Sequence, residues 1–202
     1  MYKAERLKEL LTQMNIAIFV SGNGTNCENL IRHFQTSDVA RVELVISNRA
    51  DAFALQRAQR LGVETAVIKK ADFGIEENVM PLLRKHNIDY VVLAGFLLIV
   101  PDFILKEYDG KILNIHPSLL PKYGGKGMYG HHVHEAVKAA GETETGITIH
   151  RVSNVCDGGE IVKQFKVALT PDDTVEDIEA KIHQLEMKHF PEVVEEEIKK
   201  IK

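Results

Sequence analysis

Residues 15–34 read NIAIFVSGNGTNCENLIRHF, and this stretch decides the fold. It opens with a short apolar, β-branched run that is typical of a buried strand. Two glycines follow in a turn, and the next stretch places Leu30, Ile31 and Phe34 at the spacing of a helix face that packs on a core. A strand that leads through a glycine turn into a helix is the first unit of an open α/β fold.

The same alternation continues to residue 115. We expect further strands at 42–46, 65–68, 89–94 and 111–115, and helices at 52–61, 75–86 and 103–108. The run at 89–94 (DYVVLA) is apolar without alternation, as in a central parallel strand covered on both faces. The sequence therefore predicts an α/β fold with a Rossmann-like, mostly parallel sheet flanked by helices.

The rhythm changes in the second half of the chain. A loop rich in Pro and Gly follows residue 115, and a helix is expected over 131–140. Two longer strands at 145–152 and 159–167 are predicted to be antiparallel. The last helix, at 174–197, is predicted to be interrupted near Pro191.

No repeat or low-complexity linker divides the chain, so we expect a single domain over residues 1–202. Within it we separate an N-terminal extension at 1–13, a first half at 14–115 and a second half at 116–202. The extension carries charges throughout and lacks the apolar segment of a signal peptide.

Composition excludes several classes of protein. The chain has 202 residues, 45% hydrophobic and 27% charged, which is enough to bury a sizeable core. Its formal charge of −4 argues against a basic field that holds nucleic acid, and no apolar run reaches the roughly 20 residues that span a bilayer. Cys27 and Cys156 form neither a CxxC motif nor a disulfide framework. We expect a cytoplasmic protein without nucleic-acid or membrane partners.

The glycine loop carries a phosphate-binding pattern. Gly22-Asn23-Gly24-Thr25-Asn26-Cys27 lies at the sheet edge where open α/β folds bind ligands, and a helix N-terminus stabilises anions. Thr25 and Asn26 add hydroxyl and amide donors. The loop differs from GxGxxG at Cys27, and no acid ends the second strand to hold the ribose of NAD. A single phosphate is therefore favoured over a dinucleotide and over an empty turn.

Asn114 and His116 form a candidate catalytic pair at the end of the fifth predicted strand. Residues two apart on a strand point to the same side, so an amide donor and a titratable imidazole face one cleft. Pro117 and Pro121 stiffen the loop that follows. A lone histidine here is typical of a strand end, whereas the pair favours catalysis.

Asp157, in VCDGG at 155–159, is the third candidate. A carboxylate beside an imidazole favours the protonated ring. An Asp-Gly-Gly sequence is equally typical of a plain turn between strands, so the residues alone leave both interpretations open.

In this order the segments resemble the folate-dependent formyltransferase family. The resemblance rests on the glycine loop, VVLAGF at 91–96, LNIHPSLLPKY at 113–123, the strand at 146–150 and CDGGE at 156–160. It runs from about Met14 to Pro191. Within the family, the short chain and the phosphate loop are similar to the phosphoribosylglycinamide formyltransferases. Relatives that act on methionyl-tRNA add a C-terminal RNA-binding domain, and formyltetrahydrofolate deformylases an N-terminal regulatory domain.

The resemblance implies formyl transfer from the cosubstrate 10-formyltetrahydrofolate to the primary amine of glycinamide ribonucleotide, a step of purine biosynthesis. Asn114, His116 and Asp157 match the family's catalytic trio, with His116 as the general acid. The resemblance assigns to the ribonucleotide Gly24, Thr25, Asn26, His183, Gln184, Leu185 and Glu186. It assigns to the folate Leu97, Leu98, Ile99, Val100, Asn114, Ser153, Asn154, Val155, Cys156 and Asp157. It makes 14–115 the phosphate-binding half and 116–202 the catalytic and folate-binding half.

Two positions depart from the family's pattern. Leu98 stands where better-known relatives carry Arg, which matters little if the segment binds through its backbone. Glu76 stands about where relatives offer an Arg to the glutamate tail of the folate.

Other interpretations come from different classes of function. A formyltransferase acting on another amine, such as a nucleotide sugar, is the nearest alternative. An oxidoreductase on the same sheet lacks the ribose acid, and a non-catalytic nucleotide-binding module leaves Asn114, His116 and Asp157 unexplained. Three histidines at 131–134 are typical of a metal site, but no second cluster of ligands accompanies them, so we predict no metal.

Overall fold

The computed structural model describes residues 13–202, so all but the last residue of the predicted extension at 1–13 lies outside the described part of the chain. The described chain divides into two compact units, one formed by residues 13–98 with Val194–Lys202 and the other by Ile99–Val193. The fifth predicted strand belongs to the second unit, whereas the sequence groups it with the first half.

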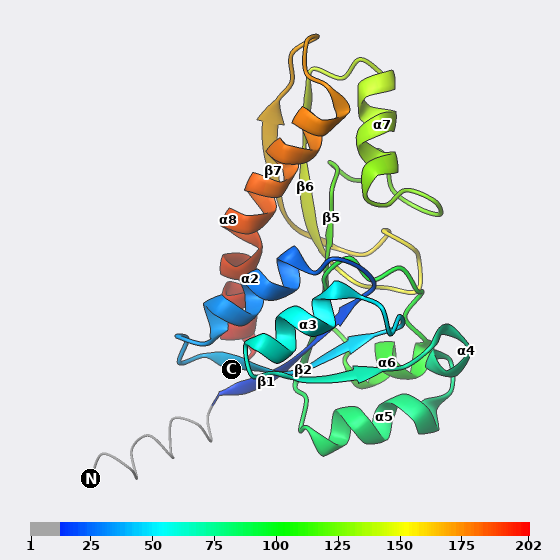
Figure 1. Ribbon diagram of the computed structural model, residues 1–202, viewed down its shortest axis with the longest axis vertical. Coiled ribbons are helices and arrows are strands. Elements are labelled where there is room, and N and C mark those ends of the chain that lie inside the picture. Colours follow the sequence, from blue (N-terminus) through cyan, green and yellow to red (C-terminus); the bar gives the residue numbers. More distant parts are fainter. Residues whose placement is uncertain (1–12) are drawn as a thin grey trace. The chain divides into compact units, whose positions relative to one another are not determined.

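The first unit is built on parallel strands with helices on both sides (Figure 1). Its strand order is β3-β2-β1-β4, with β1 at Met14–Val20, β2 at Ala40–Ser47, β3 at Glu64–Val67 and β4 at Tyr90–Leu93. Ile16, Ile18 and Phe19 in β1 are at most 1% exposed, because both faces of this central strand are covered. The carboxyl ends of β1 and β4 therefore meet at one edge, where the glycine loop begins.

Four helices follow these strands: α2 at Thr25–Phe34, α3 at Phe53–Arg60, α4 at Lys70–Phe73 and α5 at Glu76–Lys85. The predicted face of α2 is confirmed, since Leu30, Ile31 and Phe34 are buried. The single turn α4 was not expected, because four residues are too few to show a helical period.

The second unit contains the antiparallel strands. Its strands are β5 at Ile112–His116, β6 at Glu144–Arg151 and β7 at Ile161–Ala168, and β6 pairs antiparallel with both neighbours. Its helices are α6 at Asp102–Glu107, α7 at His131–Ala139 and the greater part of α8, which spans Val175–Ile201. The β6–β7 register shifts between Ile149 and His150. These pairings confirm the α/β class with antiparallel strands in the C-terminal half.

The predicted interruption of the last helix is wrong, because α8 continues through Pro191. A proline inside a helix removes one backbone hydrogen bond, but tertiary packing overrides this cost where an apolar stripe continues. Phe190 and Val193, on either side of the proline, are both at most 1% exposed. Within residues 13–202, no helix is both long and apolar enough to cross a membrane.

Candidate active site

The glycine loop is shaped by a close backbone contact in the first unit. Gly24 precedes α2 with a φ of 78°, and no side chain caps the helix at this position. A Cβ on Gly24 would lie 2.3 Å from the Cβ of Ala54 in α3. The Ala54 N–H also donates to the Gly22 carbonyl at 3.2 Å. The loop therefore needs glycine here, and it leads into the N-terminus of α2, the end of a helix that favours an anion.

Arg57 in α3 holds the other side of this loop. Its Nε donates to the Asn23 carbonyl at 2.9 Å, and its Nη2 donates to Asn23 Oδ1 at 3.0 Å. Its Nη1 pairs with Glu28 in the first turn of α2. Hydrogen bonds from Arg57 and Arg32 lower the pKa of Glu28. A charged fork thus ties the loop and the start of α2 to one helix.

The three candidate catalytic residues lie together in the second unit. Asn114 and His116 lie two positions apart on β5, and Asp157 lies in the loop between β6 and β7. His116 Nδ1 lies 3.6 Å from Asp157 Oδ1, and the His116 residue is 4% exposed. The structure thus brings the imidazole and the carboxylate together, where an ion pair forms when the ring is protonated.

The second nitrogen of His116 fixes its tautomer. Nε2 lies 2.7 Å from the backbone carbonyl of Tyr123, and a carbonyl can only accept, so Nε2 carries the hydrogen. Tyr123 adopts the left-handed region with a φ of 55°. Because Nε2 is occupied, Nδ1 is the nitrogen of His116 that can gain or lose a proton.

Asp157 is held in a loop that is more than a plain turn. Its φ is 53°, and its Oδ2 accepts the Gly125 N–H at 2.8 Å. A Cβ on Gly159 would lie 1.8 Å from the Arg151 carbonyl, so the chain passes too close to β6 for any side chain. Gly159 therefore allows the loop to run close to β6 while its carboxylate faces His116, which favours the functional interpretation of Asp-Gly-Gly.

A protein-family model described as formyl transferase matches residues 14–194. The chain belongs to the formyl transferase family. The match includes the glycine loop, β5 and the loop that carries Asp157, and it confirms the resemblance seen in the sequence.

Individual relatives of this formyl transferase agree. The phosphoribosylglycinamide formyltransferase of Haemophilus influenzae is 38% identical over 184 residues, covering 89% of this chain and 84% of that protein. The Escherichia coli enzyme of the same name is 36% identical over 186 residues, covering 90% and 85%. The crystal structure of phosphoribosylglycinamide formyltransferase from Streptococcus pneumoniae has a TM-score of 0.81 at 37% identity, covering 91% of this chain and 98% of that one.

His150 in β6 lies beside the candidate catalytic residues of this formyl transferase, and its sequence did not predict this position. Its Nδ1 lies 3.0 Å from the Arg151 carbonyl and carries the hydrogen, so its Nε2 accepts from Asn114 Nδ2 at 3.0 Å. Burial lowers the pKa of His150, which keeps the ring neutral and able to accept. Asn114 and His150 are direct partners in the antiparallel β5–β6 ladder. His150 therefore orients the amide of Asn114.

The four residues assigned to the ribonucleotide on α8 do not share one face. His183 Nδ1 lies 3.7 Å from Glu186 Oε2, and hydrogen bonding to this carboxylate raises the pKa of His183. Gln184 is exposed and Leu185 is half-buried. His183 and Glu186 thus form one polar pair on the helix, as their i, i+3 spacing requires.

The segments assigned to the folate expose apolar side chains. Ile99 is 77% exposed and Val155 is 60% exposed, whereas Val100 is buried at 5%. Leu97 is 52% exposed in the first unit, where its N–H donates to Ser21 Oγ at 2.9 Å. Exposed aliphatic side chains of this kind can pack on the flat faces of an aromatic heterocycle such as a pterin, whose edges are polar. Val100 instead packs in the core.

The remaining loop residues assigned to the folate, Ser153, Asn154 and Cys156, stand beside Val155. Ser153 Oγ accepts the Val155 N–H at 3.2 Å. Cys156 Sγ lies 3.7 Å from Asp157 Oδ2, and burial raises the pKa of its thiol. The thiol is therefore less nucleophilic at neutral pH than an unperturbed thiol, although the residue is exposed.

Glu76 stands where the resemblance leads one to expect an arginine. It begins α5, and its carboxylate lies 3.9 Å from Arg84.

Of the three histidines near 131–134, His131 lies 3.2 Å from Glu179 and His132 lies 3.1 Å from Glu135. In the described part of the chain, no three His, Cys, Asp or Glu side chains form a group that could hold a metal ion.

Proposed function

We propose that this formyl transferase moves the formyl group of 10-formyltetrahydrofolate to the primary amine of glycinamide ribonucleotide, in purine biosynthesis. The observation that carries the proposal is the cluster of Asn114, His116 and Asp157, with Asp157 Oδ1 3.6 Å from His116 Nδ1. The names of the relatives that match most of this chain support the choice of substrates.

The first step is attack of the neutral amine on the formyl carbon, which places negative charge on the formyl oxygen. The Asn114 amide has two N–H bonds, and His150 uses one of them at 3.0 Å. The second N–H is left for the developing oxyanion. Because His150 holds the amide before the substrate arrives, this donor needs no reorganisation during the reaction.

The second step breaks the bond between the formyl carbon and N10 of the folate. The protonated Nδ1 of His116 gives its proton to the leaving N10, while Nε2 stays bound to the Tyr123 carbonyl. The proton lost by the attacking amine passes to Asp157, directly or through a water molecule. The carboxylate then returns a proton to His116, so no covalent formyl-enzyme forms and neither thiol is needed.

In this scheme a few neighbouring groups bind the anionic ribonucleotide, rather than the overall charge of the protein. The ribonucleotide phosphate lies on Gly24, Thr25 and Asn26 at the start of α2, where backbone N–H groups and the helix dipole favour an anion. His183 and Glu186 supply the polar contact from α8. This arrangement agrees with a formal charge of −4, since no general basic field attracts the substrates.

Residues 97–100 and the loop at 153–157 are the parts of the chain that we assign to the folate pterin. We propose that the partners are these two small molecules alone and that the protein works in the cytoplasm, where the two free thiols, Cys27 and Cys156, stay reduced.

The test is an assay of the purified chain with 10-formyltetrahydrofolate and two amines, glycinamide ribonucleotide and an amino nucleotide sugar. We expect release of tetrahydrofolate with the first amine only. Transfer to the nucleotide sugar but not to the ribonucleotide would overturn the acceptor assignment.

The role of His116 is tested by His116→Ala, with His132→Ala as the matched control on an exposed histidine. We expect kcat to fall about 10²–10⁴-fold in the first variant, as for loss of a general acid, with little change in KM. Near-normal turnover in His116→Ala would exclude the proposed role.

A further inference from the structure

A polar network of two side chains, buried Thr148 and half-buried Gln164, holds the loop that follows β5. Thr148 in β6 donates from Oγ1 to the Ser118 carbonyl at 2.6 Å and accepts the Leu120 N–H at 3.0 Å. Gln164 in β7 donates from Nε2 to the Leu120 carbonyl at 3.0 Å and to Thr148 Oγ1 at 2.8 Å. Both backbone groups of Leu120 are thus held by side chains of the adjacent strands.

Every side-chain donor of Thr148 and Gln164 in the network is used. The two hydrogens on Gln164 Nε2 are both used, and turning the amide over would place Oε1 against the Leu120 carbonyl, acceptor against acceptor. Thr148, which is 0% exposed, donates once and accepts twice. With Thr148 buried and Gln164 half-buried, these hydrogen bonds favour one arrangement of the loop.

The loop passes this constraint on to the imidazole. Ser118 Oγ donates to the Lys122 carbonyl at 2.7 Å, which ties the loop to the residue before Tyr123. The Tyr123 carbonyl then accepts from His116 Nε2 at 2.7 Å. Other contacts act on this loop as well: the Tyr123 hydroxyl donates to Glu142 at 2.9 Å, and the Lys122 N–H donates to the Leu119 carbonyl at 3.1 Å. Neither of them fixes Leu120, whose two backbone groups bond to Thr148 and Gln164.

We propose that Gln164 is a positioning residue for His116. By fixing the Leu120 carbonyl and the Thr148 hydroxyl, it sets the loop backbone that places the Tyr123 carbonyl, and thereby the tautomer and orientation of the ring. This inference rests on the proposed function of His116 as the general acid. Gln164 itself touches neither the ring nor its carboxylate partner in the contacts above.

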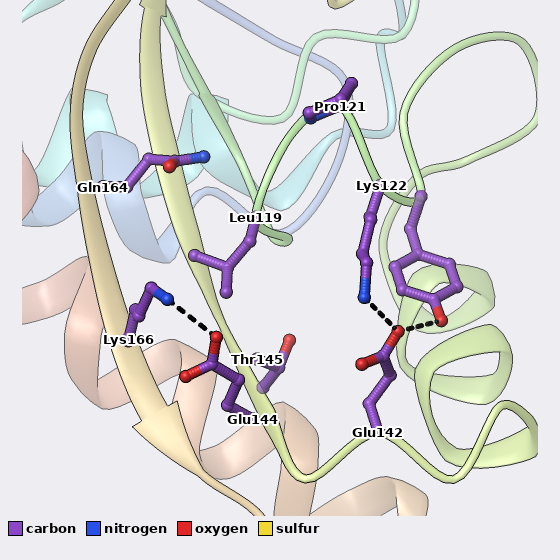
Figure 2. Close-up of a pocket in the computed structure, with 9 residues that line it drawn as sticks. Leu119, Pro121, Lys122, Glu142, Glu144, Thr145, Gln164 and Lys166 are labelled. Atoms are coloured by element: carbon purple, nitrogen blue, oxygen red, sulfur yellow. Dashed lines mark hydrogen bonds and ion pairs between the residues drawn. The ribbon is translucent and has the colours of Figure 1, made fainter.

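The position of Gln164 offers a matched control on the same strand. Gln164 and Lys166 project from β7 beside a cavity of about 250 Å³, with Leu119 and Pro121 on the loop that the network holds (Figure 2). Lys166 pairs with Glu144 at 2.7 Å, on the neighbouring strand rather than on the loop. Lys166→Met therefore changes the same cavity without touching the network.

The experiment compares Gln164→Met, which keeps the size of the side chain but removes both donors, with Lys166→Met. We expect kcat to fall about 10–100-fold in Gln164→Met, as for a small misplacement of a catalytic group, with KM for both substrates nearly unchanged. Lys166→Met should match the wild type. The proposal is overturned if Gln164→Met keeps the wild-type kcat, or if Lys166→Met loses as much.

A spectroscopic readout is independent of turnover. With nitrogen-15-labelled histidine, the hydrogen on His116 Nε2 should give a protected imidazole signal in the wild type. In Gln164→Met we expect this hydrogen to exchange about tenfold faster or more, because the loop opens more often. An unchanged signal overturns the proposal. If the wild type fails to formylate the ribonucleotide, the proposed function is wrong, but this signal still decides whether Gln164 positions the ring.

Thr148 supplies a second route to the same loop. Thr148→Val removes the hydroxyl and should reproduce the loss of kcat, while Thr148→Ser keeps the hydroxyl and should restore it. The double variant Gln164→Met with Thr148→Val should lose less than the two single losses combined, because both act through Leu120. If Gln164→Met fails to fold, Gln164→Glu replaces it, since a carboxylate cannot donate to the Leu120 carbonyl. Wild-type kcat in that variant overturns the proposal.

Discussion

Replacing Gly24 with alanine separates two costs that the glycine loop avoids. Gly24 and Gly62 both have a φ of 78°, but they differ in their surroundings. A Cβ at Gly24 would lie 2.3 Å from Ala54 Cβ and 2.7 Å from Ala54 Cα, whereas a Cβ at Gly62 meets nothing within 4 Å. The two substitutions thus share the backbone strain, and only Gly24→Ala adds an overlap between α3 and the loop.

The magnitudes follow from this difference. An L-residue in the left-handed region costs about 1–2 kcal/mol, and the stiffer unfolded chain returns about 0.4–1 kcal/mol, so we expect Gly62→Ala to cost about 1 kcal/mol. Overpacking against the α3 backbone adds about 1–3 kcal/mol, which brings Gly24→Ala to about 2–4 kcal/mol. At about 2–4 °C per kcal/mol for a chain of this size, Tm should fall roughly 4–16 °C for Gly24→Ala.

Urea and thermal unfolding of the two variants measure these costs, and steady-state kinetics measure the effect on the loop. We expect Gly24→Ala to raise KM for the ribonucleotide about tenfold or more, equal to a loss of about 1.4 kcal/mol or more in binding, while Gly62→Ala leaves KM unchanged. Equal stability losses in the two variants would refute the overlap with Ala54. A normal KM in Gly24→Ala would refute the loop's role in binding phosphate.

Three further results are expected. Asp157→Asn should lower kcat about 10²-fold or more while the fold is retained, because His116 loses its charged partner; the kinetics and the circular dichroism spectrum check this. Burial lowers the pKa of His134. The contribution of this residue to stability is therefore present above about pH 6.5 and is lost as the pH falls through the pKa of the folded state. The difference in urea midpoint between wild type and His134→Phe should shrink from pH 7 to pH 5. Burial raises the pKa of Cys27 to about 12, so a thiol reagent should modify exposed Cys156 in the native protein and reach Cys27 only after unfolding.

Local pattern was enough to predict the strands and the longer helices of the first unit, but not the single turn α4. The apolar run before Gly22 and the spacing of Leu30, Ile31 and Phe34 report burial directly, and these residues lie in β1 and α2. The alternation of Asn114 and His116 likewise predicts one shared face of a strand. Each of these inferences depends only on residues close together in the sequence.

The rest of the site depends on long-range register, which no local pattern reports. His150 reaches Asn114 only because β5 and β6 are antiparallel with these residues paired. Gln164 reaches Leu120 over 44 positions of chain for the same reason. The continuity of α8 through Pro191 also depends on tertiary packing, which outweighed the local preference.

The acceptor that fixes His116 is a main-chain carbonyl, and this changes how the site responds to mutation. Every residue type supplies that carbonyl. In a saturation scan at position 123, we therefore expect substitutions to be tolerated when the new residue can adopt a φ of 55°, and glycine and asparagine do so best. The conformation of the loop, rather than the side chain at position 123, selects the tautomer of His116. Substitutions at Thr148 and Gln164, on strands distant in the sequence, should therefore lower activity more than substitutions at position 123, whose carbonyl binds the ring.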